Sequence, residues 1–420
     1  MKIINIGVIG GGSIFTPELV DLLTRYSYKM GTINIKLMDI DKKRLDIVGS
    51  FCKRIVKKLN SFMKIEYVDT YEAAIKGSDF ILIQFRVGGE QARINDDKIG
   101  LKHKIPFVET VSVCGLASFL RTYYQMEIIA ELVKKHSPDA WIMNFSNPSG
   151  ALTEALYKLG CNKVVGICNA AMGMLSTIAK ELDADASDIF MNWRGINHLT
   201  FVDRIMYKGE NIYDSIVEKA DGNIGDFPKS FIQSIGYIPN SYIKYIYLKE
   251  KMIEELQNSS KTRAEEVYEV NAGLLKLYKD ETLDRLPEDL KKRGGFGYSR
   301  SVADLLKGIV TNDKSIHYAL VLNGSTLPEL PPDCYVEIPV IAMENELHGI
   351  QVEELPAMTR GLVVTMKQYE QMLIKGAKNR SRRDLFNAMI INPLFGSLCL
   401  AEPILNDILT ANKDFLPEIN

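Results

Sequence analysis

Residues 2–20 read KIINIGVIGGGSIFTPELV and decide the fold of this chain. A run of β-branched residues ends at three consecutive glycines, and a predicted helix follows them. A strand, glycine turn and helix in this order let the backbone approach a pyrophosphate, whose charge rests on the helix N-terminus. The pattern departs from G-x-G-x-x-G at the third glycine position. It predicts an NAD cradle made of Gly10, Gly11, Gly12, Ser13, Ile14 and Phe15.

A carboxylate follows the next predicted strand. Residues 35–40 read IKLMDI, which places Asp39 at the end of a strand about thirty residues after the glycine turn. In dinucleotide-binding folds an acidic residue at this place accepts hydrogen bonds from the ribose hydroxyls. Asp39 is therefore expected to bind NAD, although strand-end aspartates also serve as turn residues.

Apolar strands alternate with helical stretches through the first half of the chain. Strand-like runs recur at residues 80–84, 140–144 and 164–168, and helical stretches at 118–135 and 148–158 separate them. This alternation predicts an α/β fold with a Rossmann-type, doubly wound parallel sheet at residues 1–195. Long charged helices over 242–256 and 261–278, and an apolar strand around 335–341, predict an α+β domain at residues 196–420.

Composition excludes several classes of protein. The 420 residues are 46% hydrophobic and carry a formal net charge of −2, so no basic face for nucleic acid or anionic membrane is expected. Six cysteines without C-x-x-C spacing indicate reduced thiols and a cytoplasmic location. The apolar run near residue 3 is short and broken by Asn5 and glycines, so neither a signal peptide nor a membrane span is expected.

Cys168 and His198 are the first candidates for metal binding. Cys168 ends a predicted strand at the sheet edge that is expected to hold NAD, and His198 lies thirty residues later in GINHLT. A thiolate and an imidazole suit a divalent transition metal and leave coordination positions open for substrate oxygens. The alternative is a buried apolar cysteine and a structural histidine.

Nine short motifs, in order, resemble the NAD- and manganese-dependent glycosidases of glycoside hydrolase family 4. The motifs are GGGSIFTPE (10–18), RVGG (86–89) with Arg93, ET (109–110), NFSNP (144–148), CN (168–169), NH (197–198), PNSY (239–242), RGG (293–295) with YS (298–299), and LPPDCYVEIP (330–339). The resemblance implies net hydrolysis of a glycosidic bond. NAD+ oxidises C3 of the sugar, the C2 proton becomes acidic, the C1 oxygen is eliminated, water adds, and the hydride returns.

The resemblance also implies roles for individual residues. Cys168 and His198 hold Mn2+ or another divalent cation, and Tyr242 is the candidate base for the C2 proton, with Tyr237 as a competitor. A phenol has a reference pKa of about 10, so a nearby cation must lower it. Asn147 is expected to bind sugar hydroxyls. Arg93 and Arg263 are candidates for a sugar 6-phosphate, with a surface ion pair as the alternative for Arg263.

Asn169 indicates which branch of the family the chain resembles. Members that act on 6-phospho-α-glucosides carry an aspartate after the cysteine, whereas Asn169 cannot act as an acid. The resemblance therefore favours a 6-phospho-β-glucosidase that binds a phosphorylated sugar and forms a homodimer or homotetramer. Alternatives are a 6-phospho-α-glucosidase or another glycosidase of the family, an NAD-dependent 2-hydroxy-acid dehydrogenase, and a non-catalytic sensor.

Overall fold

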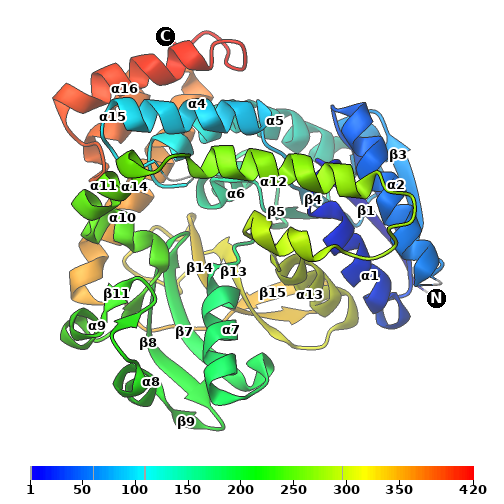
Figure 1. The fold of residues 1–420 in the computed structure, drawn as a ribbon, viewed down its shortest axis with the longest axis horizontal. Coiled ribbons are helices and arrows are strands. Elements are labelled where there is room, and N and C mark those ends of the chain that lie inside the picture. The colour runs from blue at the N-terminus through cyan, green and yellow to red at the C-terminus, as the bar shows by residue number, and fades with distance from the viewer. Residues whose placement is uncertain (1, 60, 108–109, 296) are drawn as a thin grey trace.

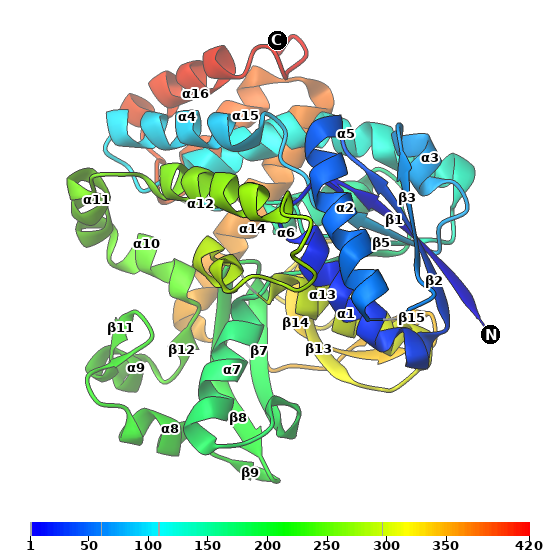
Figure 2. The same ribbon diagram turned by 45° about the vertical axis from the view of Figure 1, so that its right-hand side comes forward.

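A computed structural model describes residues 2–59, 61–107, 110–295 and 297–420. Across these residues one mixed sheet of 13 strands runs through the molecule, in the order β12-β8-β7-β14-β13-β6-β5-β4-β1-β2-β3, with β9 and β15 attached at the side. Figures 1 and 2 show helices on both sides of this sheet and the C-terminal helices beside α4 and α5. No helix within the described ranges combines the length and apolar character needed to cross a membrane.

The N-terminal part of the sheet is parallel. Its strands lie in the order β6-β5-β4-β1-β2-β3, which is the Rossmann order, and each neighbouring pair is parallel. The central strand β4 is buried along its whole length, as expected where helices cover both faces. The predicted doubly wound sheet is confirmed. The strands are β1 (Ile3–Ile9), β2 (Thr32–Met38), β3 (Lys64–Val68), β4 (Phe80–Ile83), β5 (Trp141–Asn144) and β6 (Val164–Gly166).

Helices connect these strands and cover the sheet. The helix α1 packs against α2 and α13, while α5 packs against α3, α4 and α6. Pro17 stands in the first turn of α1 and the Asp41 side chain caps α2, so both helices begin where local chemistry favours a start. The helices are α1 (Thr16–Met30), α2 (Lys42–Lys58), α3 (Tyr71–Ile75), α4 (Gly89–Lys102), α5 (Val113–His136), α6 (Ser149–Lys158), α7 (Ala170–Leu182) and α13 (Tyr298–Thr311).

The sheet continues beyond β6 with antiparallel strands. Leu320 of β13 pairs with Gly166 of β6, and β14 lies between β13 and β7. The expected boundary between residues 195 and 196 falls within β7, and the division into two domains stays a prediction. The strands are β7 (Ile189–Ile196), β8 (Leu199–Tyr207), β9 (Glu210–Asn211), β10 (Asn223–Ile224), β11 (Phe227–Pro228), β12 (Ile238–Pro239), β13 (Ile316–Leu322), β14 (Tyr335–Met343) and β15 (Glu346–Gly349).

The expected helix over residues 242–256 is broken into three pieces. The chain leaves helical geometry at Leu248, and the residues before it make aromatic contacts that periodicity does not report: Tyr242 with His198, and Tyr247 with Phe231. The remaining helices are η1 (Ala186–Asp188), α8 (Tyr213–Lys219), α9 (Lys229–Ile235), η2 (Ser241–Ile243), α10 (Lys244–Tyr247), α11 (Lys249–Asn258), α12 (Arg263–Tyr278), η3 (Glu288–Arg293), α14 (Ala357–Asn379), α15 (Arg382–Ile391) and α16 (Leu398–Ala411).

Candidate active site

The glycine turn after β1 packs too closely for side chains. Gly10 has a φ of +92°, and a Cβ there would lie 2.8 Å from the Gln84 backbone. A Cβ on Gly12 would lie 2.8 Å from Oδ2 of Asp39. Glycine is therefore required at position 10, whereas a side chain at position 12 would have to displace the Asp39 carboxylate. Phe15, which replaces the third glycine of the usual pattern, is the N-cap of α1, and the Arg293 guanidinium lies 5.3 Å from its ring centre.

Asp39 lies directly beside this turn. Its Oδ2 accepts a 2.9 Å hydrogen bond from the Gly12 amide, and its Oδ1 accepts one of 3.0 Å from the Asp41 amide. Ser13 Oγ accepts from the Phe15 amide at 3.3 Å, and the carbonyl of Ile14 accepts from a buried tyrosine hydroxyl of α12 at 3.0 Å. The structure thus places every residue of the predicted NAD cradle in one turn.

Cys168 lies between β6 and α7, with 4% of its surface exposed. Burial raises the pKa of its thiol, and the nearby carboxylate of Glu337 raises it further, while hydrogen bonds from the Ala170 amide, the Asn197 side chain and the Asn169 amide lower it. The net shift of the pKa is upward. Since a metal ligand must be the thiolate, cation binding here would displace a proton.

His198 occupies the tight turn between β7 and β8. Its backbone has a φ of +64° and its side chain is 4% exposed. The Nδ1 atom hydrogen-bonds Thr110 Oγ1. A metal on Nε2 requires the proton on Nδ1, and Thr110 is then the acceptor that holds this tautomer. Thr110 was only part of a motif in the sequence, and its role as a partner of His198 depends on a contact between distant segments.

The two candidate tyrosines differ in their surroundings. The half-buried ring of Tyr242 stacks on the imidazole of His198, with centroids 3.5 Å apart and planes inclined by 14°. Tyr237 packs edge-on against Phe201, is 4% exposed, and burial raises its pKa to about 12. Its buried hydroxyl has no hydrogen-bond partner among the described residues. This placement favours Tyr242 over Tyr237 as the candidate base.

Glu337 was not predicted as a site residue, although an acidic residue inside the apolar strand 335–341 is a signal that could have identified it. Its side chain is 1% exposed and lies on β14. Trp193 Nε1 donates to one carboxylate oxygen at 3.0 Å, and Asn197 Nδ2 donates to the other at 2.9 Å. Burial raises the pKa of Glu337 to about 7, while these hydrogen bonds act in the opposite direction.

The two candidate phosphate ligands lie where α4 and α12 meet. Arg93 lies on α4 near the buried carboxyl of Asp97. Burial raises the pKa of Asp97, and the positive charge of Arg93 partly offsets this rise. Asp97 also accepts a hydrogen bond of 3.3 Å from the Ala264 amide. Arg263 is the first residue of α12 and donates to Glu266 at 2.8 Å and to the Arg293 carbonyl at 3.1 Å. The Arg263–Glu266 pair is about half exposed, which fits the expected alternative of a surface ion pair.

Asn147 and Asn169 both follow strands at the carboxyl edge of the sheet. Asn147 is half-buried after β5, and its carbonyl accepts from Ser118 at 3.0 Å. Asn169 is the half-buried N-cap residue of α7, next to Cys168. Glu109 of the ET motif lies outside the described residues.

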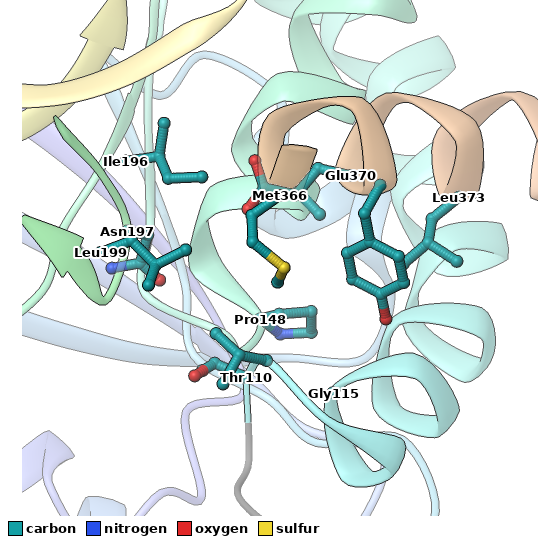
Figure 3. A pocket seen from close by; sticks show the side chains of 12 residues that line it. Thr110, Gly115, Pro148, Ile196, Asn197, Leu199, Met366, Glu370 and Leu373 are labelled. Carbon is teal, nitrogen blue, oxygen red and sulfur yellow. The ribbon is translucent and has the colours of Figure 1, made fainter. Parts of the chain in front are cut away.

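A small cavity lies behind the turn that carries His198. It has a volume of about 10 Å³ and is lined by Thr110, Asn197, Tyr369 and Glu370, among others (Figure 3). This volume holds at most one water molecule, so the cavity cannot admit a sugar phosphate. A larger hollow of about 570 Å³ lies at the opposite edge of the sheet, beside Asp79 and His136, and contains none of the candidate residues.

The donor set at Cys168 and His198 fits a divalent transition metal. Within the described residues no group of three or more His, Cys, Asp or Glu side chains is placed to hold a metal ion. A cation on Cys168 and His198 therefore needs further ligands from substrate or water, which is the open coordination that catalytic metal sites have. The buried carboxylate of Glu337 beside Cys168 also suits a positive charge.

The chain is similar to 6-phospho-beta-glucosidases over nearly its whole length. It is 32% identical to the 6-phospho-beta-glucosidase BglT of Thermotoga maritima over 98% of this chain and 99% of that protein. It is 33% identical to a probable 6-phospho-beta-glucosidase of Bacillus subtilis over 99% of this chain and 98% of that protein. A solved structure of the Thermotoga maritima enzyme with manganese, NAD+ and glucose-6-phosphate has a TM-score of 0.93, 33% identity, and coverage of 98% of this chain and 99% of that chain.

More distant structures share only the fold. The malate dehydrogenase of Cryptosporidium parvum has a TM-score of 0.56 at 15% identity, with coverage of 90% of this chain and 100% of that chain, consistent with the Rossmann-type sheet. Two family models cover most of the sequence: family 4 glycosyl hydrolase over residues 5–184, and the family 4 glycosyl hydrolase C-terminal domain over residues 193–395. The chain therefore belongs to family 4 of the glycosyl hydrolases.

Proposed function

We propose that this chain hydrolyses the O-glycosidic bond of 6-phospho-β-glucosides, with NAD+ and a divalent cation, most simply Mn2+, as cofactors. The observation that carries the proposal is the stacking of Tyr242 on His198 at the sheet edge that also holds Cys168. A candidate base and two candidate metal ligands thus share the edge with the nucleotide cradle. Family membership and the cofactors bound by the Thermotoga maritima enzyme support this assignment.

The cofactors supply the chemistry that side chains cannot. When bound, NAD+ would supply reversible hydride transfer at C3 of the sugar, and the cation would stabilise negative charge on the sugar oxygens. The Gly10–Gly12 turn and Asp39 would hold the nucleotide, and Cys168 and His198 would hold the cation.

The remaining steps belong to protein side chains. The Tyr242 phenolate takes the proton from C2, which allows the C1 oxygen to leave. Asn147 hydrogen-bonds sugar hydroxyls, and Arg93 and Arg263 bind the 6-phosphate. Asn169 cannot protonate a leaving group, so departure of the C1 oxygen depends on the electron pair left at C2 when the proton is removed. An asparagine at position 169 favours the β-glucosidase branch.

A panel of chromogenic α- and β-glucosides, each with and without a 6-phosphate, tests the proposal. The assay contains NAD+, Mn2+ and a thiol reductant. We expect cleavage of the 6-phospho-β-glucoside above the other three, with no net formation of NADH. Stoichiometric accumulation of NADH as substrate disappears would instead identify a dehydrogenase, and equal cleavage of the α anomer would overturn the β assignment.

We also infer that the enzyme is a cytoplasmic homodimer or homotetramer. Reduced cysteines and a phosphorylated substrate, which does not cross membranes unaided, support the location. Light scattering after gel filtration, and fractionation of the source cells, measure the two properties directly. A monomeric mass at assay concentration, or activity confined to the medium, would contradict the respective inference.

A further inference from the structure

Glu337 holds the segment that carries His198. It lies on β14 and pairs with Gly195 of β7. Gly195 comes two residues before Asn197. Both of its carboxylate oxygens are occupied: Oε1 accepts from Trp193 Nε1 at 3.0 Å and Oε2 from Asn197 Nδ2 at 2.9 Å. Since Trp193 and Asn197 flank Gly195 on the same strand and turn, one carboxylate fixes the path of the backbone into His198.

The Asn197 side chain that bonds Glu337 also contacts Cys168. The amide of Asn197 bonds Glu337 and also hydrogen-bonds the Cys168 sulfur. An amide group has two N–H donors, so it can serve both partners together. Asn197 is also joined to His198 by a peptide bond. The orientation of this one amide therefore affects the positions of both candidate metal ligands.

Among the described residues, Glu337 has no cationic partner. In the part of the chain that the structure describes, its side-chain hydrogen-bond partners are the neutral donors Trp193 and Asn197, and no lysine, arginine or histidine forms an ion pair with it. A buried carboxylate without a compensating charge is costly. A divalent cation held by Cys168 and His198 would supply positive charge beside this carboxylate.

We propose that Glu337 is a positioning residue for the metal site: through Asn197 it orients Cys168 and His198, and its negative charge favours the cation that they hold. This inference rests on the proposed function, because it assumes a cation at Cys168 and His198. Partners of metal ligands commonly change metal affinity by about 10- to 100-fold when they are replaced.

Direct Mn2+ binding tests the role of Glu337. The probe is Mn2+ alone, titrated into the reduced, NAD+-saturated full chain, with free Mn2+ measured by electron paramagnetic resonance. For Glu337→Gln, which keeps the shape and removes the charge, we expect Mn2+ affinity about 10- to 100-fold weaker and unchanged NAD+ affinity. Trp193→Phe is the matched control, since it removes a hydrogen bond to the same carboxylate but keeps the charge and the Asn197 contact.

The two variants separate a positioning role from a structural one. Both are expected to lower the melting temperature, but only Glu337→Gln should weaken Mn2+ binding markedly. Wild-type affinity in Glu337→Gln, or equal losses in the two variants, would overturn the inference.

If Glu337→Gln does not fold, the same Mn2+ titration is made on Asn197→Ala, which removes the side chain that connects Glu337 to Cys168. Unchanged Mn2+ affinity in Asn197→Ala overturns the inference as well. The wild-type chain and Cys168→Ser are measured alongside. If the wild type binds no Mn2+, or Cys168→Ser binds it equally well, the metal part of the proposed function fails. If the wild type binds and Cys168→Ser does not, a normal affinity in Glu337→Gln rejects the inference about Glu337 alone.

Discussion

The imidazole of His198 lies face to face with the phenol ring of Tyr242, with ring centroids 3.5 Å apart and an angle of 14° between the planes. A cation held by His198 would therefore lie near the phenol. Positive charge nearby stabilises a phenolate, and this lowers the pKa of a tyrosine toward the range where it can act as a base.

Replacing Tyr242 with phenylalanine tests this relationship. The ring that stacks on His198 stays, and only the hydroxyl is lost. We expect kcat to fall by about 10²- to 10⁴-fold, the usual contribution of a positioned acid or base, with unchanged NAD+ and Mn2+ affinities. Tyr237→Phe is the matched control, because that buried hydroxyl lacks a partner within the described residues, and it should retain near-wild-type kcat. A larger loss in Tyr237→Phe would transfer the role to Tyr237.

Thr110→Val is expected to weaken Mn2+ binding by about 10- to 100-fold. Valine has nearly the same shape but cannot accept the Nδ1 hydrogen of His198, so the tautomer with Nε2 free is no longer favoured. Thr110→Ser keeps the oxygen and should restore most of the affinity. Calorimetric titration of Mn2+ into the NAD+-saturated protein measures both. Equal affinities in the two variants would show that this hydrogen bond does not orient the histidine.

Cys168→Ser is expected to abolish turnover and to weaken Mn2+ binding by at least about 100-fold, because a serine hydroxyl does not ionise at neutral pH and is a poor ligand. NAD+ affinity, measured by fluorescence quenching, should stay at the wild-type value, since the residues predicted to bind the nucleotide lie in the turns after β1 and β2. Chelation of the wild-type enzyme should likewise remove activity, and added Mn2+ should restore it. Full activity in excess chelator is the result that rules out the metal role.

Arg263→Gln and Arg93→Gln are each expected to raise KM for a 6-phosphorylated substrate by about 10- to 100-fold, which corresponds to loss of a hydrogen bond between charged groups. The rate with an unphosphorylated glucoside should not change. Arg285, an exposed arginine after α12, provides the control variant Arg285→Gln. If Arg263→Gln behaves like this control, Arg263 serves only its contacts with Glu266 and the Arg293 carbonyl.

Hydrolysis in heavy water is expected to place deuterium at C2 of the released sugar phosphate, because the proposed base removes a proton there and solvent returns one. Nuclear magnetic resonance of the product measures the exchange. Starting material recovered at partial conversion shows whether exchange also precedes cleavage. Complete hydrolysis with only hydrogen at C2 would exclude the elimination route.

Much of the fold follows from local sequence patterns. The β1 strand, the turn at Gly10–Gly12 and the proline in the first turn of α1 follow one another within a few residues, and β2 leads directly to Asp39. Strand alternation and turn chemistry are local properties, and the rule that ligands lie at the carboxyl edge of parallel strands then identified Cys168. The helix over residues 242–256 was predicted wrongly, because contacts with His198 and Phe231 outweigh periodicity there.

The sequence by itself determined the glycine turn after β1, the parallel sheet and the identity of the candidate ligands, because these depend on neighbouring residues. Tertiary structure decided which side chains support them. Thr110 meets His198 across 88 residues, and Asn197 meets Glu337 across 140 residues. Such pairs form only when β7, β14 and the segment before α5 come together. Thr110 and Glu337 therefore support the candidate metal site because the fold buries them next to His198 and Asn197, and sequence spacing does not indicate this.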